Sequence, residues 1–549
     1  MLTRTAMTVA VLTLTLSTAF GQTGLQVPGA FPTIQSAIVA ANNGDVIQVA
    51  PGTYLETLDF LGKTIEVVSF GGPQVTIIDA AGLGTVVRFV GGEPRATHLE
   101  GFTLRGGLGI TNVPGVAEGA PGGVLCVASA PTLRNCIIEA NSGGLGTGGA
   151  IGGAGAISMH ANAFPLLEDC ILRNNMGGLG VGGPGGPGAV LSVGGMPDMI
   201  RTRVENNTGG VGTVGGAGAV ESVGGTMVLA NDEFHGNTGG AGTTAEGGPG
   251  VLRIDSTALG GIVNCILAGN QGGLGVMDIS PTVRRTGMGF TGSFLVLHAT
   301  VADNMPVGMG GSTFEGPMEV RNSILRNPAY AVEFAGPGAV AASNAIGLGG
   351  IPNAGNIDAP ALFVDPANGD YHLQADSPCR DAADPSFTGL LDLDVDADPR
   401  IVNVIPDMGA DEVCLDGTME DFIMTSTING LGDPMLCVKH AAPGDLLSVG
   451  WASPGGTFVG GNVVLLAQIY DPAQGPLYSP LAYQSLQVNA FGAALISVTG
   501  MLPAAGDSFS TNALPLPPGI TARIQAVVLS AMAANHIYAS TRAHDIITL

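Results

Sequence analysis

The sequence predicts an all-β solenoid, a parallel β-helix, and three observations lead to that fold class. Glycine accounts for 89 of 549 residues, hydrophobic residues for 45% and charged residues for only 11%, so the chain is too apolar to be disordered. A unit of about 33 residues recurs five times between Cys136 and Gly275. Within that unit hydrophobic and polar positions alternate with period two, as they do in strands that bury one face.

The repeat is marked by an asparagine that precedes x-Gly-Gly. Successive copies lie 34, 32, 30 and 33 residues apart, and a degenerate sixth copy ends at Asn304. The five positions are Asn141, Asn175, Asn207, Asn237 and Asn270. A period in the thirties with strand patterning favours coils stacked as parallel strands about 4.8 Å apart. We expect a structural asparagine ladder, because Asn tolerates the left-handed conformation of a sharp corner and stacked amides can bond from coil to coil.

Three further columns follow from aligning the copies. We expect two of them to be buried strand positions: Ile138, Leu172, Val204, Phe234 and Leu267, and then Val124, Ile157, Val190, Val220 and Val251. The third column places cysteines inward, where we expect free thiols rather than disulfides: Cys136, Cys170, Thr202, Asp232 and Cys265. Asp232 implies either a slip in register or a buried carboxylate with a partner. The glycine runs between copies are predicted to be turns.

The chain divides into five predicted segments. Residues 1–21 have a basic start at Arg4, an apolar stretch and a small-residue cleavage site, which predicts a secretory signal peptide. Residues 22–62 are the N-terminal cap, with a short amphipathic helix that carries Ile34, Ala37, Ile38 and Ala41 on one face. Residues 63–375 are the β-helix repeats, and residues 376–413 are an acidic closing segment.

Residues 414–549 lose the repeat and show alternating apolar segments between Pro and Gly turns, which predicts an all-β, sandwich-like domain. Its two cysteines, Cys414 and Cys437, could form a disulfide in an oxidising compartment or remain free.

The net charge of −25 argues against a nucleic acid partner, because phosphates would be repelled. No segment after the signal peptide has the roughly 20 apolar residues of a membrane span. We therefore expect a secreted or cell-surface protein with no nucleic acid partner and no membrane span.

Several stretches resemble the secreted bacterial right-handed parallel β-helix proteins of the pectin-lyase-like superfamily. These are VPGAFPTIQSAIVAANNGDVIQVAPGTYLE from Val27, the following HLEGFTLRGG, and NIDAPALFVDPANGDYHLQADSPCRDAADPS, which is similar to the closing segment of the branch called choice-of-anchor Q. The resemblance covers roughly residues 27–412 and implies a right-handed, single-stranded β-helix. It does not imply one activity, since the superfamily contains lyases, hydrolases, esterases and adhesins.

The catalytic segments of the esterase and polygalacturonase branches have no counterpart in this sequence. The best candidate surface for catalysis is an outward column of Glu139, Arg173, Glu205 and His235, joined by Arg203 and Glu233. A lyase would need an arginine base here. The competing interpretation is a ladder of opposite charges stacked between coils, which keeps the surface soluble.

Alternate aspartates suggest a calcium site in the closing segment, because carboxylates converge readily on a hard cation in a turn. They are Asp392, Asp394, Asp396 and Asp398. The spacing is not that of an EF-hand, and a solvated acidic turn is the alternative. No other cofactor is indicated.

The sequence thus predicts an extracellular module that binds polysaccharide or the cell envelope, without a recognisable catalytic set. A divergent polysaccharide lyase or glycoside hydrolase is the alternative, and a surface adhesin for protein partners is a third hypothesis. Turnover of a polymer would separate the enzyme from the binding proteins.

Overall fold

The structure is a computed structural model that describes most of the chain after the predicted signal peptide. The described residues are 25–109, 118–254, 259–275, 281–285, 294–306, 312–335, 340–342, 344–346, 355–374, 377–387, 394–395, 400, 405–413, 421–430, 438–441, 445–470, 495–512, 521–530, 532–533, 538–540 and 544–548.

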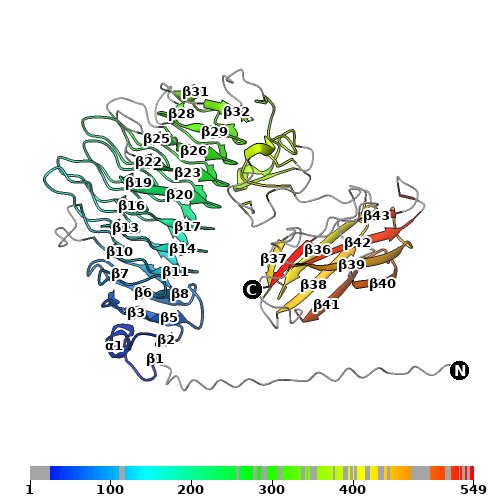
Figure 1. Ribbon diagram of the computed structural model, residues 1–549, viewed down its shortest axis with the longest axis horizontal. Coiled ribbons are helices and arrows are strands. Elements are labelled where there is room, and N and C mark those ends of the chain that lie inside the picture. The colour runs from blue at the N-terminus through cyan, green and yellow to red at the C-terminus, as the bar shows by residue number, and fades with distance from the viewer. Residues whose placement is uncertain are drawn as a thin grey trace.

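Three parallel sheets form a β-solenoid, as the repeat predicts, and each full turn gives one strand to each sheet (Figure 1). Sheet A contains β1 (Leu25–Val27), β2 (Val46–Val49), β5 (Glu66–Ser69), β8 (His98–Glu100), β11 (Thr132–Arg134), β14 (Leu166–Glu168), β17 (Asp198–Ile200), β20 (Thr226–Ala230), β23 (Leu259–Val263), β26 (Phe294–Leu297), β29 (Glu319–Arg321) and β32 (Val340–Ala342). Sheet B contains β3 (Gly52–Leu55), β6 (Thr76–Asp79), β9 (Thr103–Arg105), β12 (Ile137–Glu139), β15 (Ile171–Arg173), β18 (Arg203–Glu205), β21 (Glu233–His235), β24 (Ile266–Ala268), β27 (Thr300–Ala302), β30 (Ile324–Arg326) and β33 (Ala345–Ile346). Sheet C contains β4 (Leu58–Asp59), β7 (Val87–Phe89), β10 (Val124–Val127), β13 (Ile157–His160), β16 (Val190–Val193), β19 (Val220–Val223), β22 (Leu252–Ile254), β25 (Val283–Arg285), β28 (Ser312–Glu315) and β31 (Val332–Ala335).

The predicted strand columns are in register with one exception. Ile138, Leu172 and Val204 pair in sequence along sheet B and are fully buried in one continuous core. In sheet C, however, Val220 pairs with Leu252 and not with Val251, so the predicted column was wrong by one residue at its fifth member. Val251 is also buried, which is why hydropathy alone did not distinguish the two.

The asparagine ladder and its coil-to-coil amide bonds are confirmed. The prediction that these asparagines adopt the left-handed corner conformation was wrong. The amide of each asparagine donates to the Oδ1 of the next, with N···O distances of 2.9–3.1 Å from Asn141 to Asn270. The ladder continues through Asn304 to Asn327. The left-handed conformation belongs instead to the preceding residue, for example Asn174 (φ 55°) and Asn206 (φ 55°). The ladder side chains therefore point into the core, and the corner is made by their neighbours.

Asp232 occupies the inward cysteine column without any slip in register, since Arg203 pairs with Glu233 next to it. Its carboxylate accepts hydrogen bonds from the backbone N–H groups of Thr202 (2.8 Å) and Ala230 (3.1 Å). Cys136, Cys170 and Cys265 in the same column are buried free thiols, as predicted.

The glycine runs are more than turns, because they form a second layer over sheet C. Each glycine run extends outward and returns as two adjacent backbone segments, which together we call an arm. Backbone hydrogen bonds join the two segments of one arm and join each arm to the next. These bonds are Gly144 N–H to Ala120 O, Gly153 to Gly144, Gly178 to Gly153, Gly186 to Gly178, Gly210 to Gly186, Gly216 to Gly210, Gly240 to Gly216, Gly248 to Gly240 and Gly273 to Gly248, all of 2.7–2.9 Å.

The arms bury side chains that would otherwise face solvent from sheet C. Glu221 and Arg253 form an ion pair of 3.3 Å, and the Arg253 guanidinium donates to the Gly215 carbonyl in an arm. Arg284 makes a 3.1 Å ion pair with Glu246 of another arm. Glycine is required because a Cβ on Gly178 would lie 1.9 Å from the Gly144 oxygen.

The first coil is capped as predicted. Helix α1 (Ile34–Ala40) begins at Thr33, whose side chain accepts from the Ser36 N–H, and it buries Ile34, Ala37 and Ile38 completely. At the other end, β34 (Phe363–Asp365) and β35 (Asp370–Leu373) form a separate antiparallel pair outside the three parallel sheets. They precede residue 376, where the closing segment was predicted to start, and below we include them in that segment together with η1 (Pro366–Asn368) and η2 (Pro385–Phe387). Its residues pack on the last turns of sheet B.

The described residues of the C-terminal region form two further sheets around one core, which fits the predicted sandwich-like domain. One sheet contains β36 (Ile423–Ile428), β38 (Leu446–Ala452) and β41 (Asp507–Asn512). The other contains β37 (Val438–Ala441), β44 (His544–Thr548), β42 (Thr521–Leu529), β39 (Asn462–Tyr470) and β40 (Leu495–Met501), with β43 (Tyr538–Ser540) paired to β42. Most of these strands pair antiparallel; β37 and β44 are parallel.

Candidate functional site

The candidate residues predicted from the sequence lie together on the outward face of sheet B. Strand pairing places Glu139 beside Arg173, Arg173 beside Glu205 and Glu205 beside His235. The same column starts at Leu55, is charged from Asp79 and Arg105 onward, and continues beyond His235 to Ala268, Ala302 and Arg326. A second outward column, two residues earlier in each strand, holds Thr103, Ile137, Ile171, Arg203 and Glu233.

Neighbouring charges on this face are paired. The Arg173 guanidinium lies 2.8 Å from Glu139 and 4.0 Å from Glu205. Arg203 lies 3.1 Å from Glu205 and 3.7 Å from Glu233. Because these side chains are partly exposed, each pair contributes little to stability, about 0–1 kcal/mol. The ladder of opposite charges predicted as the structural alternative is therefore present, and it offers donors and acceptors to solvent at every turn.

The upper end of the ladder has one carboxyl group whose acidity is perturbed. Burial raises the pKa of Glu233, but the hydrogen bond with His235 (2.9 Å) and the electrostatic influence of His235, Arg203 and His372 outweigh it and hold that pKa below its usual range. A carboxyl group with a lowered pKa is ionised at neutral pH, so Glu233 is not poised as a general acid.

The closing segment covers the outward face of sheet B directly above His235. The Tyr371 ring stacks on the His235 ring, with centroids 6.2 Å apart and planes inclined by 28°, and packs over Ala268 and Ala302. The Tyr371 hydroxyl donates to Asp303 at 3.1 Å. Sequence reasoning missed Tyr371, because no periodicity links it to the repeats. The available signal was the change from charged residues to Ala268 and Ala302 in this column, which indicates that another segment covers the sheet there.

The remaining predicted site residues are only partly described. Asp394 is fully buried and accepts a hydrogen bond from the Glu412 N–H (2.8 Å), whereas Asp392, Asp396 and Asp398 lie outside the described residues. Within the described residues, no group of three or more His, Cys, Asp or Glu side chains is arranged to hold a metal. The calcium site stays a prediction. Cys414 and Cys437 also lie outside the described residues, so their disulfide is untested.

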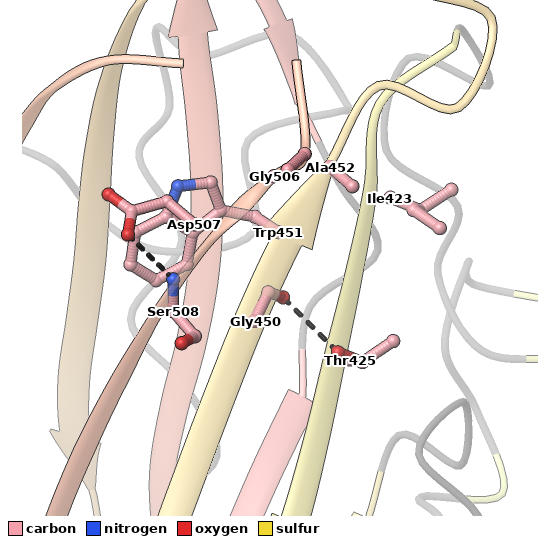
Figure 2. A pocket seen from close by; sticks show the side chains of 9 residues that line it. Ile423, Thr425, Gly450, Trp451, Ala452, Gly506, Asp507 and Ser508 are labelled. Atoms are coloured by element: carbon pink, nitrogen blue, oxygen red, sulfur yellow. Dashed lines mark hydrogen bonds between the residues drawn. The ribbon is translucent and has the colours of Figure 1, made fainter. Parts of the chain in front are cut away.

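A separate hollow of about 340 Å³ lies on the small sheet of the C-terminal region. Its lining residues belong to β36, β38, β41 and the two residues before β41, Ala505 and Gly506, and most of them are labelled in Figure 2. Thr425 donates to the Gly450 carbonyl across two strands, and the Asp507 carboxylate accepts from the Ser508 N–H (Figure 2). The hollow presents the hydroxyl groups of Thr425 and Ser508 and the carboxylate of Asp507 as hydrogen-bonding groups.

Comparison of the chain with protein-family models, curated proteins and solved structures gives no match. The fold therefore defines the class by itself: this is a parallel β-solenoid with a C-terminal, largely antiparallel β region. In the described residues no helix is long and apolar enough to cross a membrane.

Proposed function

We propose that the protein is a secreted module that binds an extended, neutral polysaccharide of the extracellular matrix or cell envelope along the outward face of sheet B. The observation that carries this proposal is the paired charge ladder from Asp79 to His235, in which guanidinium and carboxylate groups alternate turn by turn. A chain of sugar hydroxyls needs both donors and acceptors, and the ladder repeats them about every 4.8 Å.

The charge of this face also supports a neutral ligand. The acidic side chains Asp79, Glu139, Glu205 and Glu233 face three arginines, Arg105, Arg173 and Arg203, so the face carries a charge near −1 in a chain of −25. The strongly acidic remainder would repel polyanions, whereas an uncharged polymer meets no such penalty.

Binding is favoured over turnover by the state of the ionisable groups. The Arg173 guanidinium lies between the Glu139 and Glu205 carboxylates, at 2.8 Å and 4.0 Å, so it is engaged within the ladder. Glu233 has a lowered pKa and so does not suit the acid step of glycoside hydrolysis.

The test is electrophoresis of the purified protein through native gels that contain neutral or acidic polysaccharides, with parallel assays for new reducing ends and unsaturated uronates. We expect retardation by a neutral polymer and no product. The variant Arg173→Ala/Glu205→Ala should lose retardation. The matched control is Arg134→Ala/Glu168→Ala, which removes one arginine and one glutamate, paired at 2.8 Å, from the outward face of sheet A. Equal loss in both variants, or product formation, would contradict the proposal.

A further inference from the structure

A cavity of about 350 Å³ lies where the closing segment meets the ends of β27 and β30. Its lining includes Asp303, Arg326, Pro328, Phe363 and Pro366. This volume is at the lower end of the range of about 300–1,000 Å³ for small-molecule sites, which usually combine apolar walls with a few polar groups. The cavity has that composition.

The apolar wall is held in place before any ligand arrives. The Phe363 ring meets the Tyr371 ring edge-on at 5.2 Å, and the Phe363 carbonyl accepts from the Gln374 side chain at 2.7 Å. The Ala361 carbonyl accepts from the Ser377 hydroxyl. Pro328 and Pro366 have a fixed φ. A ligand would therefore lose little binding free energy to ordering of the wall.

Two charged groups, Asp303 and Arg326, face this wall, and they differ in how strongly they are bound to other side chains. The Asp303 carboxylate accepts the Tyr371 hydroxyl hydrogen bond. The Arg326 guanidinium is held less firmly, since its ion pair with Asp358 is 3.9 Å long and the Asp358 side chain is 84% exposed. Long, exposed ion pairs contribute little, so Arg326 can exchange this partner for an anion at small cost. A guanidinium binds a carboxylate through two parallel hydrogen bonds.

We propose that this cavity binds a small organic carboxylate with an apolar ring or branched chain. The ligand carboxylate pairs with Arg326, its apolar body lies against Phe363 and the prolines, and it is kept away from the Asp303 carboxylate by charge repulsion. The site is distinct from the polymer-binding face, because Ala268 and Ala302, under Tyr371, separate Arg326 from His235 in the outward column. The proposal therefore does not depend on polysaccharide binding.

The experiment uses the full protein with phenylacetate as the probe and phenylacetamide as its neutral isostere, followed by saturation-transfer NMR and calorimetry. We expect phenylacetate to bind at least about tenfold more tightly than the amide, because hydrogen bonds between two charged groups are stronger than those to a neutral group. Arg326→Gln should abolish this preference, and Arg326→Lys should retain part of it. Phe363→Ala should weaken the binding of both probes.

The control is Arg105→Gln, which removes an arginine from the same outward column far from the cavity. It should leave the preference for phenylacetate unchanged. Equal binding of the two probes, no binding to the folded wild type, or a preference that survives in folded Arg326→Gln would each overturn the proposal.

Discussion

Single buried polar side chains hold the solenoid in register, and Asn207 shows how. Its Nδ2 donates to Leu172 O (2.8 Å) and to Asn237 Oδ1 (3.0 Å), and its Oδ1 accepts from the Asn175 backbone N–H (3.0 Å). Asn207→Ala leaves the Asn175 N–H and the Leu172 carbonyl buried without these partners. At about 1–3 kcal/mol for each of these two groups, we expect the free energy of unfolding to fall by about 2–6 kcal/mol. Urea denaturation measures this, with exposed Thr208→Ala as a control that should change it by less than about 0.5 kcal/mol.

Asp232 should make stability depend on pH. Burial raises its pKa to about 8 despite the hydrogen bonds from Thr202 and Ala230. In the unfolded chain an aspartate loses its proton near pH 4, so between about pH 4 and 8 the folded state binds more protons. Stability therefore falls as pH rises through that window, by an amount on the order of 1 kcal/mol per pH unit.

The matched variant is Asp232→Ser, because Ser323 occupies a related corner and its hydroxyl already accepts from the Ala299 N–H at 3.1 Å. We expect urea midpoints of this variant at pH 5 and pH 8 to lie closer together than those of the wild type. If the difference between the two urea midpoints is the same in the variant as in the wild type, ionisation of Asp232 does not lower the stability of the folded state.

At the scale of the element, the sequence predicted the strands that alternate and missed the layer that does not. The period and the columns identify β12, β15, β18 and their partners, since a strand with one buried face leaves a two-residue pattern. The arms leave none, because glycine has no side chain to alternate. The overlooked signal was Glu221, Arg253 and Arg284, charged residues within strand segments that the structure shows to be buried.

The arms should tolerate no side chain at the contact positions. A Cβ on Gly210 would lie 2.0 Å from the Gly178 oxygen, and the φ of Gly210 is not in the left-handed region, so the expected effect is steric. We expect Gly210→Ala to destabilise the protein by about 1–3 kcal/mol through overpacking and to increase hydrogen exchange in the arms. Gly182→Asn is the control: its φ of 73° suits Asn, and the nearest atom to the added Cβ is 3.9 Å away. Equal exchange in both variants would contradict close arm packing.

For the whole molecule, the predicted division at residue 414 can be tested by the separate cores of the two regions. The largest core cluster runs from Val27 to Leu325, whereas the C-terminal cluster begins at Phe422 and contains Trp451. Trp451 is the only tryptophan, so its fluorescence reports the C-terminal region, and circular dichroism reports mainly the longer solenoid. The closing segment could not be placed from the sequence, because Tyr371 and Arg400 act through contacts that follow no repeat.

Arg400 gives the decisive variant, since it is 2% exposed and donates to the carbonyls of Asp407 (2.6 Å) and Ala410 (3.0 Å) within the closing segment. Its guanidinium also lies 3.5 Å from the buried Glu412. Removing one partner of a buried pair costs about 3–5 kcal/mol, so Arg400→Met should lower the urea midpoint seen by circular dichroism. The Trp451 fluorescence midpoint should stay where it is in the wild type. If both midpoints shift together, the two regions unfold as one cooperative unit and the division at residue 414 is not a domain boundary.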